Sequence, residues 1–406
     1  MKLLIVSQYF PPEIGAPQNR LFELAVRLQA QNVDVTVLTA MPNYPQMEIY
    51  DGYQGKKYHF EEINGIKVHR SSIYVSQNRS ITSRLRNYFS FVWSSYNIGK
   101  KKLESKYDIV LCESPPLFLG MSALKLSRKK KAKFIFNISD LWPESAEKMG
   151  IVTNKMFLKM ATWLEEYLYK KSDLITCQTM GIEENVSSRF PNKATYWLPN
   201  GVDLAYYNPD DYDRNWRKEQ GFEEDQTLMF YGGIIGHAQG LEVILNAAKR
   251  VENHKIQFIL MGTGPEKENL LRLKDALSLE NVHFLDPVTK KDMPVIISSV
   301  DVAVIPLRKL DLFKGAIPSK IFEACAMKKP VLLGVDGEAR DLFIDKGKAG
   351  YFFEPENDEH LAEVAIKISS DKELVKSLGN NARNYVDEHF NRNTISANLI
   401  KRLQNL

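Results

Sequence analysis

The segment GAIPSKIFEACAMKKPV, residues 315–331, places charged residues at the start of what its apolar residues predict to be a buried helix. Pro318 suits the first turn of a helix, because its missing N–H would have no partner there. The hydroxyl of Ser319 can accept a hydrogen bond from one of the free backbone donors of that turn. We expect the helix to run to about Lys329 and to stop before Pro330.

Two charged residues of this helix share one face. Lys320, Glu323 and Met327 stand at i, i+3 and i+7, and the apolar residues stand on another face. A lysine beside the free N–H groups of a helix N-terminus can bind phosphate. A carboxylate one turn later can accept two hydrogen bonds from a vicinal diol such as a ribose. The pair would fit a nucleoside diphosphate; the alternative is a surface Lys–Glu pair worth about 0.3 kcal/mol.

Glycine-rich loops follow two of the predicted strands. GTGPEK begins with Gly262 but lacks the third glycine of G-x-G-x-x-G, and Asp286 comes only after a further strand, which disfavours nicotinamide dinucleotide binding. Gly15 follows the first strand, where a missing side chain lets the backbone approach a phosphate. The alternative is that Gly15 and the preceding prolines only shape a tight turn.

The elements that must position these residues alternate along the chain. Short apolar, β-branched runs are separated by longer amphipathic stretches, which is typical of parallel α/β sheets. The candidate strands lie at 2–7, 33–39, 66–70, 108–113, 133–138, 173–177 and 195–198, and then at 227–232, 256–262, 282–286, 301–306, 330–334 and 350–353.

A polar segment between these two sets of strands marks a domain boundary. LPNGVDLAYYNPDDYDRNW is rich in Asn, Asp and Pro and contains the turn signal Asn200-Gly201. We therefore expect an α/β protein with two Rossmann-like, doubly wound domains, 1–200 and 201–385. A C-terminal helix at 386–406 could cross back to the first domain. Ligands of such sheets bind outside the carboxyl ends of the strands, so the loops that follow the strands would line a cleft.

The composition is that of a globular protein. Of the 406 residues, 44% are hydrophobic and 26% are charged, and no run approaches the ~20 apolar residues of a bilayer span. The first apolar run is too short for a signal peptide core. Cys112, Cys177 and Cys325 have neither disulfide-framework nor zinc-ligand spacing. These features favour a reducing cytoplasm.

Positive charge gathers in the first half of the chain. Residues 1–200 contain 27 Lys and Arg against 18 Asp and Glu, whereas the remainder contains 27 against 32. SRKKKAK, residues 127–133, contributes five of these positive charges. The basic half could face an anionic membrane surface or a phosphorylated lipid. Nucleic acid is disfavoured as a partner, because no nucleic-acid fold motif accompanies the basic run.

An aromatic segment in the same half predicts an amphipathic helix. RSITSRLRNYFSFVWSSYNIGKKK, residues 79–102, has apolar residues at helical spacing and basic residues at both ends. Such a helix can lie at a bilayer surface, with Arg84, Tyr88, Phe89 and Trp93 toward the lipid. The alternative is a helix that packs on its own sheet.

Five stretches in order resemble the motifs of one known family. PSKIFEACAMKKPV is similar to the donor-site segment of retaining, nucleotide-sugar-dependent glycosyltransferases of family 4, which have the two-Rossmann-domain GT-B fold. The other four stretches are SQYFPPEIGAPQNRLFELAVRL (7–28), PNGVD (199–203), YGGIIGHAQGLEVILNAAKRV (231–251) and ILMGTGPEKENLL (259–271). In addition, DLWPE at 140–144 resembles the branch that builds bacterial surface polysaccharides.

The resemblance implies a donor site in the second domain. Glu323 corresponds to the second glutamate of the family's E-x7-E motif, which binds the donor ribose, and Lys320 is the candidate to offset the diphosphate charge. Where the motif has its first glutamate this chain has Gly315, and Gly233 and Gln239 stand where many members carry a diphosphate-clamping Arg and Lys. The implied donor-binding residues are Gly15, Gly233, Gly236, Gly262, Val288 near the uracil, Arg308, Ser319, Lys320 and Glu323.

The family also implies how the reaction proceeds. Retaining transfer is usually drawn as same-face attack, in which the leaving diphosphate accepts the proton of the acceptor. Asp140 could assist that deprotonation, and capping a helix that begins near Pro143 is its alternative role. The other candidate catalytic residue is Glu323, through its contact with the donor ribose. Trp142 and Glu144 lie in the same loop and would face the acceptor. No metal is expected, since the D-x-D-like run at 211–213 stands in a polar linker.

The resemblance as a whole implies a retaining transferase that uses a UDP-sugar and an undecaprenyl-diphosphate-linked acceptor. The nearest branch is similar to transferases that add N-acetyl-L-fucosamine in O-antigen, lipopolysaccharide or capsule synthesis, which implies a cytoplasmic protein held at the inner face of the cell membrane. Three alternatives stay open. They are a UDP-N-acetylhexosamine 2-epimerase of the same fold, a transferase with a soluble acceptor, and a non-catalytic nucleotide-sugar-binding protein.

Overall fold

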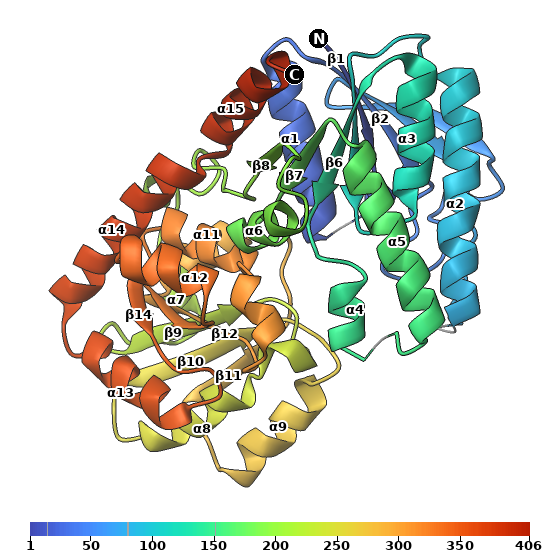
Figure 1. Cartoon of the computed structure of the whole chain (residues 1–406). Coiled ribbons are helices and arrows are strands. Elements are labelled where there is room, and N and C mark those ends of the chain that lie inside the picture. The colour runs from blue at the N-terminus through green and yellow to red at the C-terminus, as the bar shows by residue number, and fades with distance from the viewer. Residues whose placement is uncertain (14, 79–80, 151) are drawn as a thin grey trace. The chain divides into compact units, whose positions relative to one another are not determined.

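The chain divides into two compact units, Met1–Asn200 with Asn393–Leu406 (unit 1) and Gly201–Arg392 (unit 2). A computed structural model describes residues 1–13, 15–78, 81–150 and 152–406 (Figure 1). The division follows Asn200, inside the polar segment that the sequence marks by its turn residues.

Unit 1 is built on a sheet with the strand order β3-β4-β2-β1-β5-β6-β7-β8. Every neighbouring pair is parallel except β3 and β4, which are antiparallel. The strands are β1 (Lys2–Val6), β2 (Asp34–Ala40), β3 (Tyr58–Ile63), β4 (Ile66–Ser71), β5 (Ile109–Ser114), β6 (Lys133–Ile138), β7 (Leu174–Cys177) and β8 (Thr195–Trp197). The helices are α1 (Ala16–Ala30), α2 (Ile81–Lys102), α3 (Leu119–Lys130), α4 (Glu144–Lys148), α5 (Lys155–Lys171), α6 (Met180–Arg189) and α15 (Arg392–Gln404).

Helices cover both faces of this sheet, and its inner strands β1, β2, β5, β6 and β7 are buried on both sides. Along β1, Leu4 and Val6 belong to the core that α2, α3 and α5 complete, whereas Leu3 and Ile5 belong to the core that α1 and α15 complete. Successive residues of a strand point to opposite faces, which explains this division.

Unit 2 is built on an entirely parallel sheet with the order β11-β10-β9-β12-β13-β14. Numbered within the unit, this is the order 3-2-1-4-5-6, whose connections reverse direction between the first and fourth strands. The strands are β9 (Thr227–Gly232), β10 (Ile256–Met261), β11 (Val282–Leu285), β12 (Val302–Pro306), β13 (Val331–Gly334) and β14 (Gly350–Phe352). The helices of eight residues or more are α8 (Glu242–Arg250), α9 (Lys267–Ala276), α11 (Ser319–Ala326), α13 (Asp358–Ser369) and α14 (Lys372–Phe390); the shorter ones are η1 (Pro209–Asp211), α7 (Asn215–Glu219), η2 (His237–Gln239), α10 (Met293–Ser299), η3 (Asp311–Gly315), α12 (Glu338–Arg340) and η4 (Asp341–Lys346).

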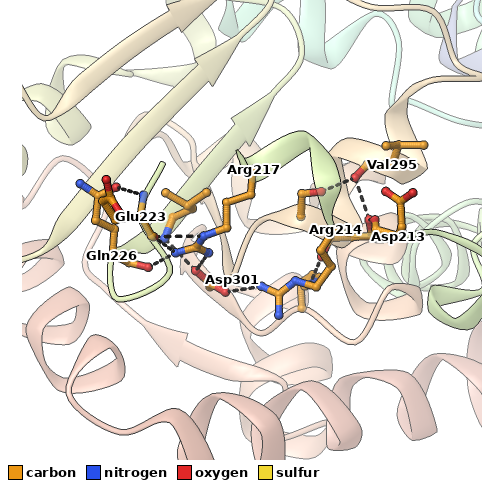
Figure 2. A network of polar contacts seen from close by, with 11 residues as sticks. Asp213, Arg214, Arg217, Glu223, Gln226, Val295 and Asp301 are labelled. Atoms are coloured by element: carbon orange, nitrogen blue, oxygen red, sulfur yellow. Dashed lines mark hydrogen bonds and ion pairs between the residues drawn. The ribbon is translucent and has the colours of Figure 1, made fainter. Parts of the chain in front are cut away.

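A network of ion pairs and hydrogen bonds joins the start of unit 2 to its sheet (Figure 2). Asp301, just before β12, pairs with Arg217 at 2.8 Å and with Arg214 at 2.9 Å. Its second carboxylate oxygen also accepts from the backbone N–H of Leu228 at 2.9 Å. The Arg217 guanidinium is buried and donates to the carbonyl of Glu223 at 2.8 Å. The network therefore fixes α7 against the beginning of β9.

The expected α/β class is confirmed, and three local expectations are corrected. β3 was not expected; it forms a hairpin with β4 through Asn64-Gly65, the two-residue turn that its sequence indicates. α11 ends at Ala326 rather than near Lys329, since Lys328 has a left-handed φ of 56°. The C-terminal residues form α14 and α15 with a break at Asn391 instead of one helix over 386–406.

Candidate functional site

The carboxyl ends of β9 and β12 are the place where the connections of the unit 2 sheet reverse, which is where ligands of such sheets bind. β9 leads into a glycine-rich loop that ends at η2. β12 leads through η3 to α11, which carries Lys320 in its first turn and Glu323 at the start of its second. The geometry of the sheet thus brings the motif at 315–331 beside the loop after β9.

The Lys320 ammonium is partly buried against Tyr231 at the end of β9. Its Nζ lies 3.4 Å from the Tyr231 hydroxyl and 4.5 Å from the centre of the ring. Burial lowers the pKa of Lys320 to about 8, although the charge of Glu323 opposes this effect. Within the described residues, Lys320 forms no ion pair with a carboxylate within 4 Å. A cation held in this way favours an anionic ligand.

Gly233 leaves the space that Lys320 occupies. It has a φ of +145°, which side chains rarely adopt, and a Cβ at this position would lie 3.2 Å from the Lys320 Nζ. The arginine that many family members carry here would therefore be strained. This chain has glycine at position 233 where many family members have arginine, and the missing side chain leaves room for the Lys320 ammonium.

Glu323 is held by groups from distant segments. Its pKa is raised because the carboxyl is buried, while a hydrogen bond from Tyr207 and the charges of Lys290 and Lys320 oppose that increase. Tyr207 itself is buried at the start of unit 2. Glu323 and Lys320 both line a small cavity of about 40 Å³, together with Lys329. The two charged residues of α11 therefore share one hollow, as their spacing predicts.

The loops after β9 and β10 run side by side as an extension of the sheet. Gly233 N–H donates to the carbonyl of Met261 and Ile235 N–H to that of Thr263, both at 2.9 Å. A Cβ on Gly262 would lie 1.8 Å from the Gly233 carbonyl oxygen. Gly262 is thus required for the packing of the two loops, which is a structural role beside the expected donor contact.

The remaining donor-site candidates of unit 2 differ in their exposure and in their contacts within the protein. Arg308 is engaged within the protein, where it pairs with Glu242 and with Glu356 at 2.9 Å. Ser319 is exposed and accepts no capping hydrogen bond, contrary to the expectation from its position. Val288, which follows β11, is exposed, whereas Gly236 is buried and its Cβ would meet the Gln239 Oε1 atom at 2.9 Å.

Gly15 precedes α1 in unit 1. Its φ of 172° is extended backbone that any residue can adopt, but a Cβ would lie 2.4 Å from the Gln18 Oε1 atom. That oxygen is buried and has no hydrogen-bond partner among the described residues. Gly15 therefore lets Gln18 fold back over the first turn of α1, and the free oxygen leaves one acceptor at this loop.

Asp140 follows β6 and lies in a partly buried position. It accepts a hydrogen bond from the Ser145 hydroxyl at 2.7 Å, and burial raises the pKa of its carboxyl. Trp142 packs its ring against Phe118, with centroids 5.5 Å apart, while Glu144 is exposed and pairs with Lys148 at 2.7 Å. The three residues of the DLWPE stretch thus have three different environments.

α2 divides its aromatic residues between the core and the surface. Leu85, Tyr88, Val92 and Tyr96 pack against the core of unit 1, whereas Phe89 and Trp93 are exposed. Arg84 and Tyr88 line a cavity of about 790 Å³, whose other described lining residues are Tyr9, Tyr44, Pro45, Gln46, Met47, Ser76, Gln77, Asn78, Ser83 and Asn87. Positions 79 and 80, the first two residues of the expected helical segment, lie outside the described residues.

The sequence alone did not identify several polar residues at these sites. Tyr207, Tyr231 and Lys290 contact or influence Lys320 and Glu323, but of these only Tyr231, at a strand end, carried a recognisable signal. In unit 1, Arg20 pairs with the buried Glu113 at the end of β5, to which Asn137 also donates at 2.6 Å. No motif marks this buried network.

Among the residues that the structure describes, no three or more His, Cys, Asp or Glu side chains gather in a way that could hold a metal ion. None of the described helices combines the length and the apolar character that crossing a bilayer requires.

Comparisons with known proteins agree with the two-unit division. Residues 18–206 match the family described as Glycosyltransferase Family 4, and residues 213–385 match Glycosyl transferases group 1. WcaI of Escherichia coli (strain K12), whose name assigns it to colanic acid biosynthesis as a glycosyl transferase, is 24% identical over 333 residues, 80% of this chain and 81% of WcaI.

Two solved structures share the fold over the full chain. Sucrose-phosphate synthase from Thermosynechococcus elongatus has a TM-score of 0.76 at 16% identity and covers 100% of this chain and 98% of its own. HepE of Anabaena, in complex with UDP and glucose, has a TM-score of 0.71 at 17% identity and covers 100% of both chains. The expected GT-B fold is thereby confirmed.

Proposed function

The chain is a glycosyltransferase that carries a family 4 domain followed by a group 1 domain, and from this premise we propose a specific reaction. It transfers a sugar from a UDP-sugar, with retention of configuration at the anomeric carbon, to an undecaprenyl-diphosphate-linked acceptor. The product would enter a bacterial surface polysaccharide such as O-antigen, lipopolysaccharide or capsule. The likeness to WcaI supports a role in polysaccharide synthesis, and the DLWPE stretch supports this branch of the family.

The observation that carries the donor assignment is that Lys320 and Glu323 lie on one face of the first two turns of α11 and line one cavity. The ammonium has only Tyr231 as a direct polar partner among the described residues, and the carboxylate shares its cavity. A diphosphate would supply the missing negative charge, and a ribose would supply two hydroxyl donors to Glu323. HepE, the full-length structural neighbour, was solved with UDP and glucose, which supports a uridine nucleotide.

The proposed reaction needs few protein groups. The bond between the anomeric carbon and the diphosphate oxygen breaks, and the acceptor hydroxyl forms the new bond on the same face of the sugar. The hydroxyl proton passes to the departing diphosphate, with Asp140 as a second acceptor whose raised pKa suits that task. Lys320 stabilises the charge that develops on the leaving group. Glu323 holds the ribose and so fixes the position of the anomeric carbon.

The acceptor would bind to unit 1. The cavity of about 790 Å³ is lined by tyrosine and amide side chains, which suit sugar rings and hydroxyls, and Arg84 could pair with a lipid-linked phosphate. N-acetyl-L-fucosamine, or another N-acetylated aminosugar, is the donor sugar that the family branch suggests. A lipid-linked acceptor would hold the protein at the cytoplasmic face of the membrane, with α2 beside the lipid.

Calorimetric titration of the purified protein with UDP, GDP, ADP and NAD tests the donor site. We expect UDP to bind, and Lys320→Ala and Glu323→Ala to weaken that binding by about 1–3 kcal/mol each, the usual cost of losing a charge-assisted hydrogen bond. Lys249→Ala is the comparison variant, since Lys249 lies on α8 of the same unit in an exposed pair with Glu252 at 2.8 Å, and it should leave the UDP affinity unchanged. Preference for NAD or GDP, or indifference to both α11 substitutions, would refute the assignment.

Activity assays separate the remaining alternatives. A transferase consumes the UDP-sugar only when a lipid-linked acceptor is present, whereas a 2-epimerase converts UDP-N-acetylhexosamine without an acceptor. A binding protein would show neither reaction. Transfer to a soluble acceptor at an equal rate would refute the lipid-linked substrate.

A further inference from the structure

We propose that α2 and α5 together form a membrane-docking surface that inserts aromatic and methionine side chains into the interface of an anionic bilayer. The sequence drew attention to α2 alone; the structure adds α5. The biological role of this surface rests on the proposed function, in which the acceptor is linked to a lipid of the membrane. Its physical basis, however, is the surface of unit 1 alone.

Large apolar side chains are exposed on both helices. On α2 these are Phe89, 45% exposed, and Trp93, 73% exposed, which stand one turn apart. On α5 they are Met156, 73% exposed, Met160, 63%, and Trp163, 66%. The spacing of i, i+4 and i+7 places the α5 residues on one face. Hence each helix presents an apolar stripe outward in addition to its core face.

An aromatic cluster centred on the buried Phe118 packs α2 and α5 against α3. Phe118, at the start of α3, lies 4.9 Å from Phe89 and 6.1 Å from Phe157, measured between ring centres. α3 packs against both α2 and α5 and lies on the same face of the sheet (Figure 1). Leu158, Ala161 and Leu164 of α5 are buried, so the exposed residues are not part of the core packing. Large apolar side chains exposed on two helices that pack against a common third helix indicate an interaction surface.

The positive charge of the helices that carry these stripes favours an anionic partner. α2, α3 and α5 contain thirteen Lys or Arg, two Glu and no Asp. Glu165 is buried and pairs with Arg189 at 2.7 Å, and Glu166 pairs with Lys170 at 3.3 Å. Exposed cations, among them Lys155 and Lys159, border the methionines. The surface therefore carries nearly uncompensated positive charge.

An anionic bilayer fits this combination better than a second copy of the chain. A symmetric pairing would bring two sets of cations together, which is unfavourable. At a bilayer, tryptophan rings lie at the level of the headgroups, methionine side chains adapt to the acyl boundary, and lysines contact anionic lipids. Exposed apolar residues flanked by Lys and Arg are typical of proteins that lie on a membrane without spanning it.

Vesicle flotation of the full chain tests the proposal, with vesicles of phosphatidylcholine alone or with about 30% phosphatidylglycerol. We expect the protein to bind the anionic vesicles, and the triple variant Met156→Ser, Met160→Ser, Trp163→Ser to partition about tenfold less. Phe60→Ser is the matched control, because Phe60 is 49% exposed on β3 of the same unit, outside this surface. Lys155→Glu with Lys159→Glu should reduce binding to the anionic vesicles only.

Several results would overturn the proposal. They are an absence of vesicle binding by the unaltered protein, equal binding by the triple variant, equal binding to phosphatidylcholine alone, or a dimer that the triple variant abolishes. UDP titration of the same variants keeps the two proposals apart. Vesicle binding without UDP binding would refute the donor site and leave this surface, whereas UDP binding without vesicle binding would refute this surface only.

Discussion

At the scale of single residues, the donor-site proposal depends on Lys320 and Glu323, whose charged forms are destabilised by burial in the protein. The pKa of Lys320 is lowered to about 8 and that of Glu323 is raised, in both cases chiefly by burial. A bound diphosphate would reverse the shift at Lys320. A buried lysine of this kind favours binding of an anionic ligand, because the ligand supplies the negative charge that the free site lacks.

The affinity for UDP should consequently depend on pH. Below pH 8 Lys320 carries its proton in the free protein, and above pH 8 the free protein loses it, so binding must include proton uptake. We expect the affinity to fall above pH 8 by up to about tenfold per pH unit, as measured by calorimetry in buffers of different ionisation enthalpy. In Lys320→Met the affinity should be lower and should not vary with pH in this range. A wild-type affinity that is constant from pH 7 to 10 would contradict the assignment of this lysine.

Gly262 offers a test of the loop packing. In Gly262→Ala the new Cβ would overlap the Gly233 carbonyl oxygen, in a residue with a φ of +149°. We expect a loss of about 2 kcal/mol or more in the free energy of unfolding, measured by urea denaturation, together with weaker UDP binding. Gly315→Ala is the matched control, since no atom lies within 4 Å of its Cβ position, and it should change stability by less than about 0.5 kcal/mol.

At the scale of elements, the Asp301 network couples the first segment of unit 2 to β9 and β12 (Figure 2). Arg217 on α7 is buried and has a carboxylate and a backbone carbonyl as partners. Removing one partner of a buried pair leaves the other charge uncompensated, which costs far more than a surface pair contributes. α7 should therefore be essential to the stability of the unit despite its short length.

We expect Arg217→Ala to destabilise unit 2 by about 3 kcal/mol in urea denaturation. The reference is Lys249→Ala, which removes an exposed pair with Glu252 at 2.8 Å and should cost less than about 1 kcal/mol. Equal effects of the two substitutions would show that the network contributes little. A circular dichroism spectrum of each variant in the absence of urea establishes that it is folded.

At the scale of the whole molecule, the two proposals assign different ligands to different units. The nucleotide would bind at the loop after β9 and the start of α11 in unit 2, whereas lipid would contact α2 and α5 in unit 1. Each unit has its own hydrophobic core, so each can present its site on an independent scaffold.

Amide hydrogen exchange should distinguish the two ligands. We expect UDP to slow exchange at 233–240 and in α11, because a bound ligand suppresses local opening at its site. Anionic vesicles should slow exchange in α2 and α5 and leave α11 unchanged. Protection of α5 by UDP alone, in the absence of vesicles, would contradict this assignment.

The sequence by itself determined the class of the fold and the placement of Lys320 and Glu323 on one face of a helix. Strands of a parallel sheet are buried on both faces and so appear as apolar runs, whereas β3 alternates Tyr58, Phe60 and polar residues and pairs antiparallel to β4, and it escaped notice. Residues three apart on a helix share a face whatever the rest of the chain does.

Only the tertiary structure decided which groups complete each site. Tyr231 stands 89 residues before Lys320, and Tyr207 is more distant still from Glu323, so no local pattern could predict these contacts. The same holds for α2, where Tyr88 packs inward and Trp93 points to solvent although both belong to one apolar stripe. When the apolar stripe of a helix is wider than the area that the helix buries, the neighbouring elements decide which of its residues are buried. For α2 the neighbouring helix is α3, which packs against it only in the folded chain.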